Sequence, residues 1–421
     1  MSEWKRYKLS DLYEMSSGIS STKEQAGHGS PFLSFSVVFN NYFLPDNLID
    51  LMDTTDGEKQ KYSINEGDIF LTRTSETVDE LAMSSVALKD YPEASFSGFL
   101  KRLRPVDKTI VYPKFMAFYL RSPLFRRTII NNTVMTLRAS FNEAMFSYLE
   151  IMLPDFDTQK KIGDFLYSLE KKKQINNQIN QELEAMAKTL YDYWFVQFDF
   201  PDQNGKPYKS SGGKMVYNQD LKREIPEGWG VEKLGDVAKF KNGINYEKTS
   251  SGSEKVKIIN VRNISSSTIF VNQTDLDEIS LENDKSTKFI VNEGMILITR
   301  SGIPGATRLV SELEAKTVYS GFIIASEVND LIFKNLIFYY LKNVEEVLKN
   351  QSAGTIMKNI SQSVLTDMVI SLPPQNVLLK FNSIIDNLLE QMKNVQRQNQ
   401  ELTQLRDWLL PMLMNGQVKV E

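Results

Sequence analysis

The stretch Ile64-Asn-Glu-Gly-Asp-Ile-Phe-Leu-Thr-Arg73 returns later in the chain as Val291-Asn-Glu-Gly-Met-Ile-Leu-Ile-Thr-Arg300. In both copies an Asn-Glu-Gly turn precedes a short run of apolar, β-prone residues, a pattern typical of a strand. Each run ends on Thr-Arg. We therefore predict two equivalent strands, over residues 69–72 and 296–299, with an arginine directly after each.

The similarity between the two halves of the chain extends on both sides of these strands and keeps its order. The other recurring pairs are Trp4 to Ile19 with Trp229 to Ile244, Ser97-Gly-Phe99 with Ser320-Gly-Phe322, Ile151 to Pro154 with Ile370 to Pro373, and Asn180 to Leu183 with Asn399 to Leu402. Short chance matches would not keep one order over so long a span, so the repeat predicts a duplicated architecture. We expect an α+β fold with two tandem mixed domains related by a pseudo-two-fold repeat.

A long helical segment follows each mixed domain, because its apolar residues recur every three and four positions. The first predicted seam runs over Ile162, Phe165, Leu169, Lys172, Asn176, Ile179, Leu183, Met186, Leu190 and Tyr193, and the second over Ile385, Leu388, Met392, Val395, Asn399, Leu402, Arg406 and Leu409. A helix of about 35 residues is about 50 Å long and needs a partner of similar length. We expect the two helices to form an antiparallel coiled coil. Lys172, Asn176 and Asn399 either fix its register or mark where the helices diverge.

These patterns divide the chain into six parts. They are the first mixed domain (1–154), the first long helix (155–198), a linker (199–225), the second mixed domain (226–373), the second long helix (374–416) and a C-terminal tail (417–421). The linker is assigned because Pro201 to Lys214 is rich in Gly, Ser and Pro. The aromatic run from Tyr191 to Phe198 either buries the end of the first helix or offers a platform on which bases stack.

The composition excludes several kinds of enzyme. The 421 residues include no cysteine and one histidine, His28, so a disulfide framework, a thiol nucleophile, a zinc cluster and a His-based triad are not expected. No phosphate loop, dinucleotide fingerprint or metalloprotease motif occurs. We interpret Gly302 to Gly305 as a turn and His28 as a loop residue without a metal. The charged first residues and the lack of a long apolar run predict a cytoplasmic protein without a signal peptide or membrane span.

Basic residues cluster locally although the formal net charge is −4. Nine lysines and arginines against one acid lie between Lys101 and Arg138, and six against two between Lys239 and Arg262. Such runs favour a surface that faces a polyanion, although an ordinary solvated face is the alternative. The candidate residues in these runs are Arg102, Arg104, Lys241 and Arg262.

Loops at the ends of the paired strands carry further candidates. Arg73-Thr74-Ser75 and Arg300-Ser301 are suited to phosphates and base edges, and arginine matches guanine with two hydrogen bonds, or these residues bond only within their own domain. Two aligned loops carry amides of the kind that pair with adenine, together with basic residues. Their candidate residues are Asn131, Asn132 and Arg138 in the first copy and Asn350, Gln351, Lys358 and Asn359 in the second.

Taken together, these elements resemble the DNA-specificity subunit of Type I restriction-modification systems. The resemblance rests on Asn292-Glu-Gly294 with Thr299-Arg300, on Pro154 leading to Gln159-Lys-Lys-Ile162, on Tyr193-Trp-Phe-Val-Gln-Phe198, and on Phe200 to Tyr208 with Ile225-Pro-Glu-Gly-Trp229. The second copy departs from the pattern after Pro373-Pro374, where Asn376-Val-Leu-Leu379 replaces the Gln-Lys-Lys-Ile run.

The resemblance implies a non-catalytic subunit in which each mixed domain is a target-recognition domain for one half of a bipartite target in double-stranded DNA. It implies that the helices set the gap between the halves and dock two methylation subunits, which carry S-adenosylmethionine and modify adenine, and that restriction subunits can join. The chain itself would bind no cofactor. The alternative is a protein scaffold of two repeats that does not bind DNA, in which the basic runs are incidental.

Overall fold

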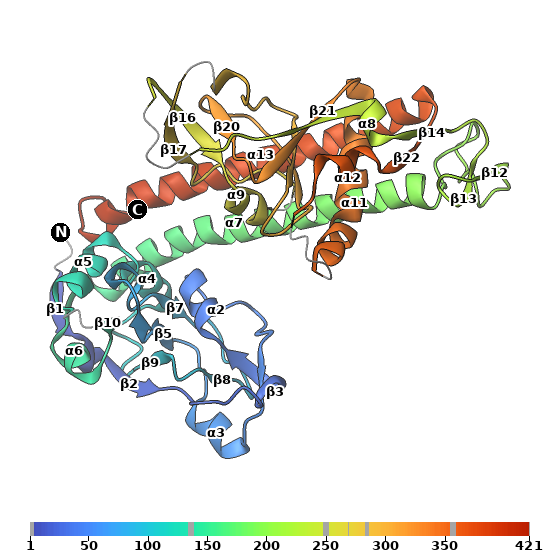
Figure 1. The fold of residues 1–421 in the computed structure, drawn as a ribbon. Helices are drawn as coiled ribbons and strands as arrows, with labels where there is room; N and C mark the ends of the chain where they lie inside the picture. Colours follow the sequence, from blue (N-terminus) through green and yellow to red (C-terminus); the bar gives the residue numbers. More distant parts are fainter. Residues whose placement is uncertain are drawn as a thin grey trace. The chain divides into compact units, whose positions relative to one another are not determined.

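The computed structural model describes residues 4–133, 139–246, 252–267, 269–282, 286–353 and 359–420. The chain divides into two compact units: Met1–Asn176 with Arg397–Glu421, and Asn177–Gln396. Each unit contains one mixed domain and part of each long helix. Figure 1 follows the chain in colour from the blue N-terminal domain through the green helix α7 to the red helix α13.

The first unit contains two small sheets. Four antiparallel strands have the order β2 (Tyr13–Ser17), β9 (Leu100–Pro105), β5 (Ile69–Thr72), β7 (Ser84–Val86). Three further strands have the order β4 (Leu51–Met52), β3 (Ala26–Leu33), β8 (Ser95–Phe96), and β3 and β8 are parallel. β1 (Lys5–Lys8) pairs with β11 (Glu150–Leu153), so the two ends of the domain lie side by side.

The second unit repeats the order of the strands in both sheets and in the terminal pair. Its four-stranded sheet has the order β15 (Ala238–Asn242), β21 (Ile323–Val328), β18 (Ile296–Thr299), β19 (Thr307–Leu309). Its three-stranded sheet has the order β17 (Asp277–Leu281), β16 (Glu254–Ile259), β20 (Thr317–Tyr319), again with one parallel pair. β14 (Gly230–Lys233) pairs with β22 (Val369–Leu372). The sequence repeat is therefore a structural repeat, and both strands predicted from the opening motif are confirmed at their expected bounds.

Further helices and two pairs of short strands, β6 (Thr74–Ser75) with β10 (Ala139–Ser140) and β12 (Met215–Asn218) with β13 (Arg223–Pro226), complete the two units. The bounds of these helices are α1 (Leu9–Leu12), α2 (Phe35–Asn40), α3 (Asp56–Lys61), η1 (Val78–Glu80), α4 (Pro113–Tyr119), α5 (Pro123–Asn131), α6 (Glu143–Tyr148), α8 (Leu234–Val237), α9 (Val261–Ser265), η3 (Leu331–Phe333), α11 (Lys334–Ala353) and α12 (Gln362–Thr366).

The central strands β5 and β18 are buried along their whole length, which explains why their sequences do not alternate between apolar and polar residues. Ile69 and Leu71 pack in one core of the first unit, and Phe70 packs in another. In the second unit Ile296 and Ile298 likewise face one core, and Leu297 faces another. Each strand thus has a hydrophobic cluster on both faces.

The two long helices are α7 (Phe156–Tyr191) and α13 (Gln375–Met414), and they pack together in antiparallel fashion. Glu170 lies 3.3 Å from Arg406 between Oε2 and Nη1, and Asn176 Nδ2 donates to Asn399 Oδ1 at 3.0 Å. In the second unit the Tyr191 and Phe381 rings are 6.5 Å apart. Residues further along α7 thus contact residues earlier in α13. The two helices are antiparallel, as predicted.

Six of the ten seam positions predicted in and after α7 lie on its packed face. The buried or half-buried residues are Ile162, Phe165, Leu169, Asn176, Leu183 and Leu190, whereas Lys172, Ile179, Met186 and Tyr193 are exposed. The neighbouring residues Lys173, Asn180 and Ala187 are buried or half-buried in place of Lys172, Ile179 and Met186. Both sets of residues keep a spacing of three and four from the positions that they share, such as Asn176 and Leu183. The sequence pattern therefore could not show which set packs against the other helix. The seam lysine is therefore Lys173, which lies 3.5 Å from Glu170.

The aromatic run at the end of α7 belongs to the core, as the first of its two interpretations expected. Residues Asp192–Val196 continue α7 as a π-helix, and Trp194, Phe195 and Phe198 are buried. The Phe195 ring lies 4.6 Å from that of Phe381 and 5.9 Å from that of Trp229. These rings are therefore not a platform on which bases could stack.

The segment assigned as a linker is ordered. The Asp199 carboxylate accepts hydrogen bonds from the backbone N–H and the hydroxyl of Ser210, and Phe200 stacks on Tyr208 with ring centres 4.8 Å apart. β12 and β13 then form a hairpin. A few aromatic side chains thus anchor a segment whose overall composition is that of a flexible connection.

None of the described helices is long and apolar enough to cross a membrane.

Two glycines that recur in the repeat allow close packing, which gives a stability test. A Cβ at Gly18 would lie 2.2 Å from the Ser97 carbonyl oxygen, and one at Gly243 would lie 2.3 Å from that of Ser320. We expect Gly18→Ala and Gly243→Ala each to destabilise their own unit by about 1–3 kcal/mol, because backbone must move. Amide hydrogen exchange measures the two units separately.

Gly57→Ala is the matched control. Gly57 lies in α3 with open space around it, so alanine is expected to be neutral or slightly stabilising there. Unchanged protection in Gly18→Ala and Gly243→Ala would show that the two turns adapt and do not constrain the domains.

Candidate nucleic-acid interface

In both domains an arginine follows the central strand and lies across from a phenylalanine. Thr72 pairs with Leu100 and Thr299 with Ile323, so the next residues, Arg73 and Arg300, face Phe99 and Phe322. The backbone N–H of Arg73 donates to the Phe99 carbonyl at 2.9 Å, and that of Arg300 donates to the Phe322 carbonyl at 2.8 Å. We call this arrangement the strand-end site.

A third segment joins each strand-end site. The Arg73 carbonyl accepts a hydrogen bond from the Phe141 N–H, and the Arg300 carbonyl accepts one from the Ile360 N–H, both at 2.9 Å. Phe141 and Ile360 closely follow the two loops that were predicted to carry amide side chains. The structure therefore joins the segment that follows each amide loop to the strand-end site of the same domain.

The threonine before each arginine closes the loop that begins there. The Thr72 hydroxyl accepts a hydrogen bond from the Met83 N–H, and the Thr299 hydroxyl accepts one from the Ala306 N–H, both at 2.9 Å. The threonine carbonyls accept from the N–H groups of Ala82 and Gly305, which both have a positive φ. The enclosed loops are residues 73–82 and 300–305, so the same frame holds loops of different length and sequence.

The side chains of the strand-end sites differ in exposure. Arg73 is exposed, and its Nη1 lies 3.5 Å from the Gly98 carbonyl, while Thr74 and Ser75 are half-buried in β6. Arg300 and Ser301 are half-buried. Within the described part of the chain, Arg300 Nε has no hydrogen-bond acceptor. Both sites thus present arginine at the end of a rigid strand.

The predicted amide loops are described only in part. Asn131 and Asn132 are exposed at the end of α5, where Asn132 Nδ2 donates to the Thr128 carbonyl at 2.8 Å. Asn359 is exposed one residue before Ile360. Arg138 and Lys358 lie outside the described residues, as do the side chains of Asn350 and Gln351.

The first basic run is largely internal. Arg102 is 8% exposed, and its Nη1 donates to the Ser63 carbonyl at 2.6 Å; burial lowers the pKa of its guanidinium. Arg104 binds the buried Asp68 carboxylate through Nε at 2.8 Å and Nη2 at 2.6 Å, which raises the arginine's pKa. These guanidinium groups hold the domain together and are not presented as a basic patch.

The second basic run is paired with acids. Lys241 Nζ lies 2.9 Å from Glu327 Oε2, and Lys255 and Lys257 both contact Glu278. Because these pairs are solvent-exposed, each adds little stability, but each lowers the local positive charge. The run is basic along the sequence, whereas in space an acid lies beside these lysines.

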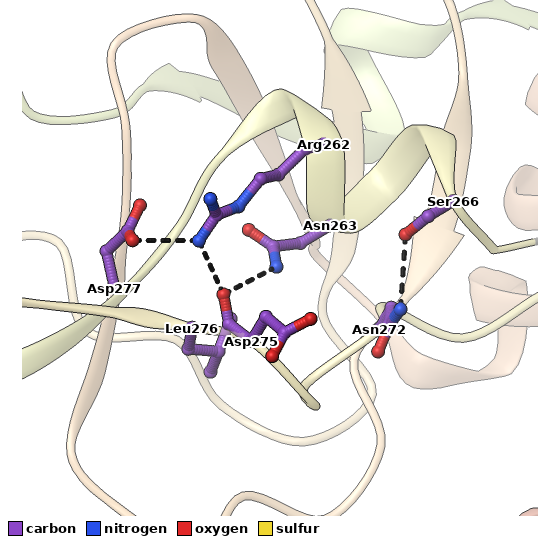
Figure 2. A pocket seen from close by; sticks show the side chains of 7 residues that line it. All are labelled: Arg262, Asn263, Ser266, Asn272, Asp275, Leu276 and Asp277. Atoms are coloured by element: carbon purple, nitrogen blue, oxygen red, sulfur yellow. Dashed lines mark hydrogen bonds and ion pairs between the residues drawn. The ribbon is translucent and has the colours of Figure 1, made fainter. Parts of the chain in front are cut away.

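Arg262 lines a polar pocket of about 550 Å³, shown in Figure 2. Its Nη2 donates to the Asp275 carbonyl at 2.7 Å and to Asp277 Oδ1 at 2.8 Å. The other lining residues are Asn263, Ser266, Asn272 and Leu276. Because its guanidinium is paired with the Asp277 carboxylate, this arginine is poorly placed for a phosphate.

Two smaller predictions concern turns and metal sites. Gly302 and Gly305 have positive φ in a turn, as predicted. His28 is exposed, but it lies in the irregular strand β3 and not in a loop, because flanking Gly27 and Gly29 allow a bulge there. Among the described residues, no cluster of His, Asp and Glu has the geometry of a metal site.

The loop-closing threonines give a second stability test. We expect Thr72→Val and Thr299→Val to destabilise their own unit by about 1–3 kcal/mol, because the Met83 or Ala306 N–H loses its acceptor while the side-chain volume is kept. Thr72→Ser and Thr299→Ser keep the hydroxyl and should recover most of the loss. Amide exchange at Met83 and Ala306 reports the effect, and valine variants that match wild type there would contradict it.

Comparison with known proteins places the fold and the repeat in one family. The family model described as the Type I restriction modification DNA specificity domain matches residues 1–185 and 226–404, that is, both mixed domains with much of each helix. The match covers most of the chain, and it confirms the resemblance read from the sequence.

Two relatives and one solved structure agree with this family. The specificity subunit of the Type I restriction enzyme MjaIX from Methanocaldococcus jannaschii is 28% identical over 65% of this chain and 61% of its own length. The corresponding HindI subunit from Haemophilus influenzae is 24% identical over 99% of this chain and 100% of its own length.

The Type I S subunit of M. genitalium has the same fold, with a TM-score of 0.57 and 15% identity over 98% of this chain and 96% of that one. The fold, the internal repeat and the family match agree. The chain therefore belongs to the Type I restriction-modification DNA specificity family, and it is a non-catalytic subunit that recognises the DNA target of a Type I complex.

Proposed function

We propose that each strand-end site reads one half of a bipartite target in double-stranded DNA. The observation that carries this proposal is that one hydrogen-bonded frame around Arg73 and around Arg300 holds loops of different length, 73–82 and 300–305. Two readers with the same frame and different loops are suited to half-sites of different sequence.

Comparison of the two copies assigns the candidate DNA-binding residues to two roles. Arg73 and Arg300 stand at the same position although the half-sites are expected to differ, so we assign them to phosphate contacts, which carry no sequence information. The loop residues that differ between copies are assigned to base edges. They are Thr74, Ser75, Asn131 and Asn132 in the first copy and Ser301, Asn350, Gln351 and Asn359 in the second.

Arg138 and Lys358 are further phosphate candidates because they end the amide loops. We leave Arg102, Arg104, Lys241 and Arg262 out of the interface, because each has a partner within its own domain. The proposal therefore rests on the ends of the strands and on the amide loops, and not on these four basic residues.

We further propose that α7 and α13 set the gap between the half-sites and dock two methylation subunits. Asn176 is buried and donates to Asn399, and such a seam pair favours one register of the helices. S-adenosylmethionine would be bound by the methylation subunits, which modify adenine, and restriction subunits would join the same cytoplasmic complex.

Removing one strand-end arginine tests the assignment to phosphate. We expect Arg73→Ala and Arg300→Ala each to weaken DNA binding by the complex by about 1.5–3 kcal/mol, equally for all sequences. The slope of log affinity against log salt should flatten by about one unit. Salt-dependent titrations of the complex with methylation subunits measure both quantities.

Arg6→Ala and Lys233→Ala are matched controls, since both remove an exposed cation that has an acidic partner. They should leave affinity and salt slope unchanged. Relaxed discrimination in one half-site after Arg73→Ala would show a base contact instead. Unchanged affinity and slope would show that the arginine is structural.

Lengthening the helix pair tests the proposal that it sets the gap. Both helices cross from one unit to the other, so a heptad is added after Gln174 in α7 and another after Gln400 in α13, on opposite sides of the seam. Seven residues add about 10 Å to each helix, which is about three base pairs. We expect the preferred gap to lengthen by about three base pairs. The measurement is methylation of a series of duplexes in which the gap between the half-sites is varied one base pair at a time.

An insertion of one heptad in α7 alone is the matched control, because α13 then lacks the added length and cannot pair with the lengthened α7. This variant should not methylate targets with the longer gap. If the double insertion folds and keeps the original gap, the helices are a docking device and do not act as a ruler.

A further inference from the structure

Each recognition domain holds an exposed phenylalanine at the same position. Phe99 is 67% exposed and Phe322 is 62% exposed, and both follow the glycine of the recurring Ser-Gly-Phe segment. A phenylalanine side chain is usually buried, so two equivalent exposed rings in one chain call for a partner.

The turns that carry these rings are held firmly. The Gly98 N–H donates to the Ile19 carbonyl, and the Gly321 N–H donates to the Ile244 carbonyl, both at 2.7 Å. A Cβ at Gly98 would lie 2.9 Å from the Ile19 oxygen, so the chain fits closely there. The following residues, Leu100 and Ile323, return at once to buried strands. The rings are therefore fixed in an exposed position.

The surroundings of the two rings are the same as well. Phe99 faces Arg73, and Phe322 faces Arg300, at the first position beyond a strand pair, where side chains on neighbouring strands lie close together. An apolar ring beside a cation suits DNA, which offers apolar base faces and steps next to phosphates. The arginine thus favours DNA over an apolar protein surface as the partner.

We propose that Phe99 and Phe322 are wedges, each inserted at a base step of one half-site while the facing arginine contacts the backbone. This inference rests on the proposed function of the strand-end sites. Insertion of an apolar side chain between bases depends little on their identity. That tolerance explains why two domains with different loops keep the same ring.

The wedges predict a specific pattern in binding experiments. In the complex with methylation subunits, Phe99→Ala and Phe322→Ala should each lower DNA affinity roughly 5- to 100-fold, similarly for cognate and altered half-sites. The salt slope should stay unchanged because no charge is lost, which distinguishes these variants from Arg73→Ala. Phe99→Leu and Phe322→Leu should keep most of the affinity, since leucine also acts as a wedge.

Unstacking provides an independent readout. The half-sites are first defined by mapping the adenines that the wild-type complex methylates. 2-Aminopurine is then placed at successive positions of each half-site, and its fluorescence should rise where the wild-type complex opens a step. Phe99→Ala should abolish the rise in one half-site only, and Phe322→Ala in the other.

Val106→Ala and Leu331→Ala are matched controls, because each removes an exposed apolar side chain elsewhere in the same domain. Wild-type affinity and fluorescence in the Phe→Ala variants would overturn the wedge. Failure of these variants to assemble with methylation subunits would also overturn it, and would assign the rings to protein docking. A wild-type complex that does not prefer a bipartite target would instead refute the proposed function.

Discussion

The burial of one four-residue strand on both faces is the constraint on which each domain depends. Every residue of β5 and of β18 is at most 1% exposed, with a separate hydrophobic cluster on either side. A strand buried in this way cannot slip by one residue, because a slip would move its large side chains into the wrong cluster. The core thus fixes the position of the arginine that follows the strand, and the backbone hydrogen bonds of that arginine to Phe99 and Phe141, or to Phe322 and Ile360, build on it.

The repeat made much of this fold predictable. Two copies of one motif located the central strands to the residue, and of the two interpretations of the aromatic run after Leu190 the structure confirms burial at the end of the helix. The direction of the helix pair also followed from the pattern. What the sequence could not show is which side of the α7 stripe faces α13, since Lys172 and Lys173 fit the spacing equally well.

The basic runs were informative about charge along the chain but not about charge in space. Lys101 is 3% exposed and lies 2.6 Å from Glu143, and Arg104 meets Asp68, although the acids are distant in sequence. Such pairs form only when strands come together, so counting charges in a window misses them. The exposed ring of Phe99 was missed as well, and the recurrence of Ser-Gly-Phe was the signal that could have revealed it.

Under the proposed function, in which the strand-end loops read the target, the threonine-closed loops have a consequence for how target specificity can evolve. Hydrogen bonds to Thr72 and Thr299 hold both ends of each loop, so residues can be inserted or deleted between them without moving the sheet. Lengthening a loop from six to ten residues costs only about 0.5 kcal/mol in closure entropy. After a duplication, the two copies can therefore acquire new specificities separately, by exchange of short surface cassettes, while the assembly with partner subunits is inherited unchanged.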